Sequence, residues 1–417
     1  MRVVLARGEG ELAVEFRQRA ATAALHAHPG ARTEVLREFD IEIASDLGGF
    51  ERFWPNLGDL DGQADARAYP FQCRDHLEIW IQTIGKGCGF HPVLVKVSTK
   101  NGTPLMLIPL GLRRSGGLRY LEFLDAGVSD YNAPVLLRPT EQPSPAEARA
   151  LWKKICCTLP PFDVAVLRKM PQRVADFPNP LHVLGTDPWP DSGHQIMLAG
   201  SDPAALQARS ERSDNRRKRG QLAKCGTVEF RIASEESEIR KVFDAFVQQK
   251  TGQLRETRGK DSFDVPGQEA YYLTLTKKFS GRGVYLFYLA VGDVIVATCW
   301  CFVAGRRFYY MMPAYDRGEW RKRSPGRILL EDLVAWAHGN NIEVFDFGIG
   351  DEEYKFKWKQ EPLSLAGLVE PRTAAGHVYA CVVRLRRFAK KRLPARLVQI
   401  LKGVRSVPKP LDASGKT

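Results

Sequence analysis

A short segment in the C-terminal third of the chain combines residue types that bind phosphate groups. Arg323-Ser324-Pro325-Gly326 precedes a stretch with helical period. Ser324 suits the N-cap of that helix, and Pro325 suits its first position, where the missing N–H has no consequence. Gly326 has no Cβ, so a ligand can approach the backbone there. Because the free N–H groups and the dipole of a helix start attract anions, the segment predicts a pyrophosphate site.

Titratable side chains follow this helix start. The apolar residues recur with helical period up to Gly339, and Ile342–Phe347 has the composition of a buried strand. Asp346 lies in that strand, and Tyr354 and Lys355 come shortly after it. The order of loop, helix and strand therefore brings a carboxylate, a phenol and an amine toward a bound cofactor. Each group also has a structural alternative: Asp346 as a strand-end cap, Tyr354 as a core aromatic, and Lys355 as a solvated charge.

The two halves of the chain repeat one order of elements, which predicts two copies of one α/β unit. Each half contains a hairpin of apolar strands, with Asn101-Gly102 at one turn and Gly292-Asp293 at the other. These dipeptides are hairpin signals because the turn positions need positive φ. The expected strands lie at 91–98, 105–112, 283–290 and 294–303. The predicted fold class is α/β, with mixed α+β sheets in two similar units.

Composition sets the expected domain boundaries. Residues 1–33 are rich in Ala and Arg without a sustained period, and we expect them to be weakly ordered. The segment 188–202 is rich in Pro, Asp, Ser and Gly and separates the halves. We therefore predict one domain at 34–195, which lacks the phosphate loop, and a second at 196–380, which carries it. A basic helix and tail follow at 381–417.

Positive charge is concentrated in two segments, against a net charge of +13 for the whole chain. No acidic residue occurs from Pro371 to Leu411, and the apolar residues there form a stripe, which predicts a basic amphipathic helix. That helix either rests on an anionic membrane surface or packs as an ordinary terminal helix. A helix is expected from Pro203 to about Lys224, and the run Arg212–Arg219 within it is expected to be a solvated helix face. No recognised nucleic-acid-binding module accompanies it, so nucleic acid is not an expected partner.

Other patterns exclude further classes of protein. The eight cysteines include no C-x-x-C pair, and the histidines show no ligand spacing, so no metal site is expected. No apolar run reaches the ~18–20 residues that span a bilayer. The first 30 residues lack the apolar centre of a secretory signal. We expect a cytoplasmic protein, with a peripheral position at the inner membrane face as the alternative that the basic helix provides.

Several motifs resemble known acetyltransferases. Arg323-Ser324-Pro325-Gly326-Arg327-Ile328 resembles the Arg/Gln-x-x-Gly-x-Gly/Ala loop with which GNAT-type N-acetyltransferases hold the pyrophosphate of acetyl-CoA, although Ile328 replaces the last small residue. Phe345-Asp346-Phe347-Gly348 and Gly350-Asp351-Glu352, with Tyr354-Lys355, resemble the CelD/BcsL family of GNAT-like acetyltransferases, which is linked to bacterial cellulose and exopolysaccharide production. The resemblance covers about residues 36–400. That family is similar to the FemABX peptidyltransferases, which carry two GNAT-like halves in one chain.

The resemblance implies an acyltransferase that uses acetyl-CoA or another acyl-CoA and no metal. The acceptor would be an amine or hydroxyl of a small molecule or glycan. The residues that the resemblance assigns to cofactor binding are Arg323, Ser324, Gly326, Arg327 and Ile328.

The resemblance also implies catalytic roles. Asp346 or Asp130 would take the proton of the acceptor, Tyr354 would protonate the CoA sulfur, and Lys355 would contact the acyl end. Asp130 is chosen by position, and otherwise it only begins a turn. Two rival functions remain open. A FemABX-like transferase would use aminoacyl-tRNA, held by the basic run at 212–219, and a non-catalytic GNAT-fold subunit would serve a polysaccharide assembly.

Overall fold

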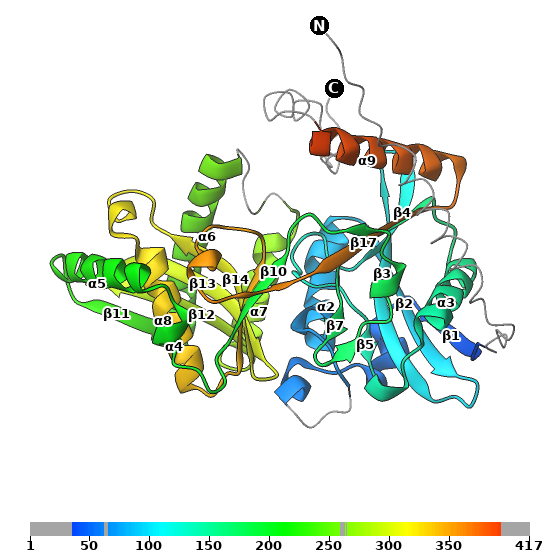
Figure 1. The fold of residues 1–417 in the computed structure, drawn as a ribbon, viewed down its shortest axis with the longest axis horizontal. Coiled ribbons are helices and arrows are strands. Elements are labelled where there is room, and N and C mark those ends of the chain that lie inside the picture. Colours follow the sequence, from blue (N-terminus) through cyan, green and yellow to red (C-terminus); the bar gives the residue numbers. More distant parts are fainter. Residues whose placement is uncertain (1–35, 62–65, 259–262, 264, 393–417) are drawn as a thin grey trace, which may run out of the picture. The chain divides into compact units, whose positions relative to one another are not determined.

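The computed structural model describes residues 36–61, 66–258, 263 and 265–392 (Figure 1). The contacts of the chain divide it after Glu38. Of the first unit, residues 36–38 are described and have no regular secondary structure. The second unit begins at Phe39 and contains every element named below. The weakly ordered segment predicted at 1–33 lies outside the described residues, as does the tail from 393 onward.

The first sheet is built mainly from the N-terminal half of the chain. Across the sheet its strands are β1 (Phe39–Ala44), β2 (Phe90–Thr99), β3 (Pro104–Ser115), β4 (Leu118–Phe123), β6 (Val164–Pro171), β17 (Leu365–Pro371) and β9 (Asp187–Pro188), with β5 (Val135–Leu136) paired to β3. The predicted hairpin forms between β2 and β3, where Val95 pairs with Ile108. Gly102 has a φ of 78° in its turn, which is the positive φ that the sequence required.

The second sheet carries the predicted phosphate loop. Its strands, in order, are β11 (Val228–Ile232), β12 (Val284–Val291), β13 (Val294–Ala304), β14 (Arg307–Tyr315), β15 (Val344–Ile349), β10 (Gly193–Met197) and β16 (Glu361–Leu363). The predicted hairpin between β12 and β13 also forms, with Gly292 at a φ of 56°. Strands β14 and β15 run parallel, whereas the other neighbours in this sheet are antiparallel.

The two halves exchange strands. Strand β17 follows the second sheet in sequence but pairs with β6 and β9 of the first sheet. Strand β10 pairs with β15, and it spans the predicted boundary between 195 and 196. One buried core cluster also joins the halves, since the rings of Phe71 and Phe302 meet at 5.7 Å. The chain therefore contains two sheets that share one compact unit, and their division does not follow one cut in the sequence.

Helices cover the faces of both sheets and connect the strands. Those of the described chain are α2 (Arg74–Trp80), α3 (Pro145–Thr158), α4 (Pro203–Leu206), α5 (Arg209–Ala223), α6 (Glu236–Arg258), α7 (Gln268–Phe279), α8 (Pro325–Gly339) and α9 (Ala374–Arg392). Helix α9 begins before the predicted boundary at 381. Among these helices, none combines the length and the apolar composition that a membrane span requires.

Candidate functional site

The pairing between strands β14 and β15 covers only part of both strands. Their parallel register comprises three pairs, from Arg307 with Val344 to Tyr309 with Asp346, although β14 continues to Tyr315. The pairing of β14 with β13 is also shifted between Tyr310 and Met312. Beyond Tyr309, β14 therefore has no paired strand on its β15 side, and we refer to this unpaired stretch as the gap between the two strands. Backbone N–H groups in such a gap can donate to a ligand, because the sheet does not use them.

The predicted phosphate loop lies at the far end of β14. Ser324 is at the N-cap of α8, but its backbone is left-handed (φ 52°) and its side chain makes no cap hydrogen bond, so the reason given for it from sequence was wrong. Pro325 occupies the first helical position, as predicted. A Cβ on Gly326 would lie 3.0 Å from the Tyr315 ring. Glycine here allows α8 to pack against β14, which the sequence did not reveal.

The other residues of this loop are engaged by protein groups. Arg327 pairs with Glu211, at 2.8 Å, and with Asp214 of α5. Arg323 donates to the Glu319 carbonyl at 3.1 Å and lies over the Trp320 ring. The side chain of Ile328 is fully buried in the core. The predicted cofactor residues therefore lie together at one helix start, but Arg327 is neutralised and Ile328 can offer only its backbone.

Asp346 is fully buried, and both oxygens of its carboxylate accept hydrogen bonds. Its Oδ1 accepts from the Tyr131 hydroxyl and from the Gly348 N–H, both at 2.8 Å. Its Oδ2 accepts from Arg307 at 3.0 Å. Tyr131 belongs to the first half of the chain and Asp346 to the second. This geometry favours the structural alternative for Asp346, which ties the two halves together.

Asp130 is the candidate base that was chosen from sequence by position alone. Its carboxylate lies against Gly348, where an added Cβ would meet Oδ2, and Gly348 has a φ of 71°. The Ile349 N–H donates to the same carboxylate. Burial raises the pKa of Asp130 to about 7, against the opposing effect of the Lys169 cation, and the charge of Asp346 adds to the increase. A carboxyl with this pKa is part protonated and part ionised near neutral pH.

Tyr354 and Lys355 lie in the same neighbourhood. The Lys355 ammonium is buried and donates to the Gly348 and Gly350 carbonyls, at 3.2 and 2.9 Å, and pairs with Glu352 at 2.9 Å. Its three N–H donors therefore all hold the end of β15 and the segment that follows it. The rings of Tyr354 and Tyr310 meet in an edge-type arrangement with centroids 6.4 Å apart, and burial raises the pKa of the Tyr354 hydroxyl well above the usual range. It thus remains a proton donor at neutral pH.

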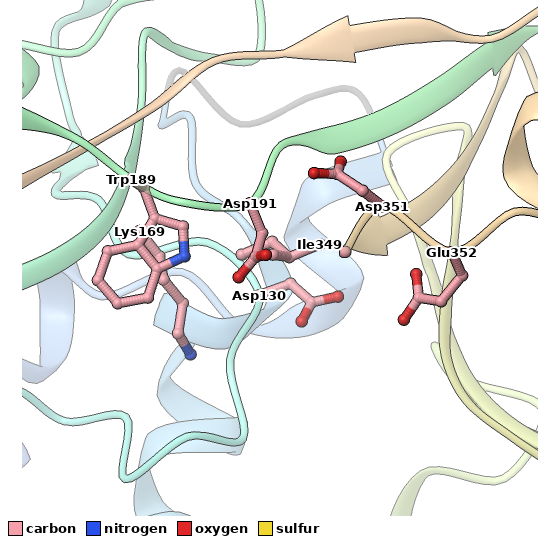
Figure 2. Close-up of a pocket in the computed structure, with 8 residues that line it drawn as sticks. Asp130, Lys169, Trp189, Asp191, Ile349, Asp351 and Glu352 are labelled. Atoms are coloured by element: carbon pink, nitrogen blue, oxygen red, sulfur yellow. The ribbon is translucent and has the colours of Figure 1, made fainter. Parts of the chain in front are cut away.

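A pocket of about 480 Å³ opens beside Asp130 (Figure 2). In the figure, Trp189 and Lys169 lie on one side and Glu352 on the other. The lining residues are Asp130, Lys169, Trp189, Asp191, Ile349, Gly350, Asp351 and Glu352. Sequence reasoning did not assign Lys169, Trp189 or Asp191 to a site. Trp189-Pro190-Asp191 lies in the segment that was predicted to be a domain boundary. The presence of an aromatic and an acidic residue in that connecting segment was the signal that could have indicated a role in a site.

Acidic groups dominate the pocket. Lys169 pairs with Asp125 at 2.9 Å and donates to the Ser129 carbonyl, so its charge holds the loop that carries Asp130. The Nε2 atom of His194 contacts Oδ1 of Asp351 at 2.8 Å. Asp191 and Asp351 are exposed. A negative pocket with an indole wall favours a cationic ligand, by charge and by the ring face. In the described parts of the chain, no His, Cys, Asp or Glu cluster is arranged to hold a metal ion.

Comparison with known proteins identifies the second half. Residues 209–356 match a family described as an acetyltransferase (GNAT) domain. The match runs from the start of α5, through the loop before α8, to the residue after Lys355. A search of curated proteins finds no match to this chain. The resemblance to the CelD/BcsL family therefore stays a prediction.

Solved structures extend the likeness to the first half. FemX has a TM-score of 0.50 and 12% identity, covering 76% of this chain and 95% of its own. L-PGS from Bacillus licheniformis has a TM-score of 0.46 and 12% identity, covering 75% and 96%. A tandem GNAT protein from the clavulanic acid biosynthesis pathway has a TM-score of 0.45 and 12% identity, covering 80% and 98%. The likeness to FemX concerns the fold. Residues 209–356 thus match a GNAT acetyltransferase domain, and the two sheets of the chain fit two GNAT-like units in tandem, as predicted.

Proposed function

We propose that this protein is an acyltransferase that moves an acyl group from acyl-CoA to an amine, with the pocket beside Asp130 as the acceptor site. One observation carries the proposal. Asp130, from the first half, lies against Gly348 of the GNAT domain, lines an acidic pocket, and has a pKa raised to about 7 by burial. A general base is most effective when its pKa lies near the working pH.

The donor would occupy the gap between β14 and β15. Its diphosphate would lie at the start of α8, where the dipole and the first-turn N–H groups favour an anion. From Tyr315, beside Gly326, back to Tyr310, β14 spans about 17 Å at a strand's rise per residue. The pantetheine arm of CoA has a comparable length. The thioester would then reach the neighbourhood of Gly348 and Asp130.

The proposed reaction is direct transfer. The acceptor arrives as an ammonium and loses a proton to the ionised Asp130 carboxylate, and the free amine attacks the thioester carbonyl carbon. Backbone N–H groups of β14 would stabilise the oxyanion of the tetrahedral intermediate. The intermediate then breaks its C–S bond, the CoA thiolate takes a proton from Tyr354, and the amide product leaves. The proton held by Asp130 returns to solvent. The second proton of the attacking nitrogen, lost as the C–S bond breaks, passes through solvent to the Tyr354 phenolate, so that the amide, the CoA thiol and one released proton balance the reaction.

Two residues receive different roles from those expected from sequence. Asp346 already accepts three hydrogen bonds and has no exposed surface, so it would hold Tyr131, next to Asp130, in place. Lys355 already donates to two carbonyls and a carboxylate, so it would shape the strand end instead of contacting the acyl end of the donor. Both would be positioning residues.

The acceptor class follows from the pocket. Its acidic lining and Trp189 favour an amine over a neutral hydroxyl. An amino sugar of a polysaccharide precursor would fit this class and the predicted CelD/BcsL relationship. The aminoacyl-tRNA alternative draws less support, because part of the positive charge of α5 is neutralised by protein carboxylates: Arg219 pairs with Asp332 of α8, and Arg217 with Asp214 of α5 itself.

Titration calorimetry with acetyl-CoA tests the donor site. Gly326→Asp places a carboxylate at the diphosphate position, and we expect at least a tenfold loss of affinity relative to Gly326→Ala. Both variants add the Cβ that meets Tyr315, so their difference isolates the charge. Gly339→Asp, at the opposite end of α8 and with no atom near its Cβ, should bind like the wild type.

Turnover with a panel of amines, amino sugars and neutral sugars tests the reaction. Amide formation with amines and not with neutral sugars supports the proposal. Wild-type protein that binds acetyl-CoA but transfers to none of them is a non-catalytic subunit. Protein that binds aminoacyl-tRNA and not acetyl-CoA favours the FemABX-like alternative.

A further inference from the structure

Helix α9 presents a row of large apolar side chains to solvent. Val378, Val382 and Leu385 are 66%, 39% and 67% exposed. Their spacing of four and three residues places them on one face of the helix. Few large apolar side chains elsewhere in the described chain are this exposed, and these three form a continuous stripe.

The opposite face of α9 fixes the helix on the first sheet. The helix packs on β17 and β6. Ala380 is buried, and Gly376 approaches the Asp163 carbonyl so closely that a Cβ would collide with it. Tyr379 meets the Tyr120 ring at 5.3 Å. Because these contacts orient the helix, Val378, Val382 and Leu385 must face away from the sheet.

Cationic side chains flank this stripe. Arg384 and Arg386 are exposed and, by helical position, lie on opposite sides of it. No acidic residue occurs between Pro371 and Leu411, so no residue of this segment offsets its charge, and among the described cations of α9 it is Arg387 that pairs with a carboxylate elsewhere, Asp187. An aliphatic stripe between cations is the pattern of a helix that lies in a lipid interface, where the arginine stems extend along the apolar zone and their heads reach phosphates.

We propose that α9 docks on the surface of an anionic lipid bilayer, with Val378, Val382 and Leu385 in the acyl boundary and Arg384 and Arg386 against lipid phosphates. A second copy of the chain is the less suitable occupant. Three side chains cover far less than the roughly 1,200–2,000 Å² that stable protein interfaces bury, and arginines of two copies would face one another. This surface does not depend on the proposed acyl transfer.

Vesicle sedimentation with the full chain tests the proposal. Vesicles of phosphatidylcholine alone are compared with equimolar phosphatidylcholine and phosphatidylglycerol. We expect binding to the anionic vesicles that weakens with salt, since exposed charges are screened. Arg384→Gln with Arg386→Gln should reduce the partition coefficient about 30-fold, from roughly a factor of five per cation.

The apolar stripe is tested separately. The triple variant Val378→Asn, Val382→Asn and Leu385→Asn should lose at least about tenfold in partitioning, while its circular dichroism and melting stay unchanged because the three side chains are exposed. Val294→Asn, which changes a 46% exposed valine of the β12–β13 hairpin, is the matched control and should bind like the wild type.

Three results would overturn the proposal. Wild-type protein that stays in the supernatant with both vesicles has no such surface. Equal binding of the wild type and the triple variant assigns the lipid contact to another part of the chain. A wild-type dimer in light scattering that becomes a monomer in the triple variant assigns the stripe to self-association.

Discussion

Replacing Asp130 with asparagine should raise stability and remove activity at once. The substitution keeps the size of the side chain, and the amide oxygen can still accept from the Ile349 N–H. It removes the ionisable group that the pocket holds at a raised pKa. The charge of Asp130 is unfavourable in the folded state but necessary for the proposed reaction. Removing this charge should therefore raise the free energy of unfolding and lower the activity, as expected where an active-site residue is kept at a cost in stability.

The size of the stability change follows from linkage. Burial raises the pKa of Asp130 from 3.8 to about 7. Between these values the unfolded chain is ionised while the folded protein keeps its proton, so the free energy of unfolding falls as pH rises and levels off above about pH 7. The full shift corresponds to about 4 kcal/mol, and solvent in the pocket reduces this to about 1–3 kcal/mol. Asp130→Asn should therefore be more stable by that amount at pH 8 and nearly unchanged below pH 4.

Two measurements check this prediction. Urea denaturation at pH 4 and pH 8 should show the gain at the higher pH alone. Steady-state kinetics should show kcat/KM reduced by about 10²–10⁴, with the wild-type limb near pH 7 absent from the variant's profile. Asp191→Asn, at an exposed position in the same pocket, is the control and should change KM for amines more than stability. A variant with wild-type kcat/KM and no gain at pH 8 would refute the role of Asp130.

Two further predictions concern the contacts around it. Arg307→Met should lower the free energy of unfolding by about 3–5 kcal/mol, because it leaves the buried Asp346 carboxylate without its cation. Arg306→Met breaks an exposed pair with Glu343 and should change the free energy of unfolding by less than about 1 kcal/mol. Similar losses for the two variants in urea denaturation would contradict the proposed importance of the Arg307–Asp346 pair. Gly348→Ala combines a positive φ with a clash against Asp130, so it should cost more than the roughly 1–2 kcal/mol expected for Gly117→Ala, which has a φ of 78° and open space around its Cβ. Gly348→Ala should also abolish turnover, and equal effects of the two substitutions would show that Asp130 does not lie where we describe it.

Local chemistry was enough to predict many of the elements. Asn101-Gly102 and Gly292-Asp293 predicted two hairpins, and both formed with glycine at positive φ. Pro325 and the apolar period predicted a helix that ends at Gly339, and α8 has those ends. Boundaries were less accurate. The helix expected from Pro203 to Lys224 is interrupted, because α4 ends at Leu206 and α5 begins at Arg209.

The site depended on contacts between residues far apart in sequence. Asp346 and Tyr131 meet across the two halves, and nothing near either residue indicates its partner. From the sequence, Arg327 was expected to bind an anion, but in the structure it forms ion pairs with Glu211 and Asp214 of α5. Trp189 and Asp191 became pocket residues because the crossover segment passes beside β15.

The sequence by itself determined the hairpins, the helix start and the GNAT-like order, since turn conformation, capping and periodicity depend on neighbours along the chain. Only the tertiary structure decided which carboxylate faces a pocket and what its pKa is. Asp130 and Asp346 carry the same chemical group. Burial beside few donors raises the pKa of Asp130, whereas Arg307, Tyr131 and Gly348 satisfy Asp346, and those surroundings come from distant segments.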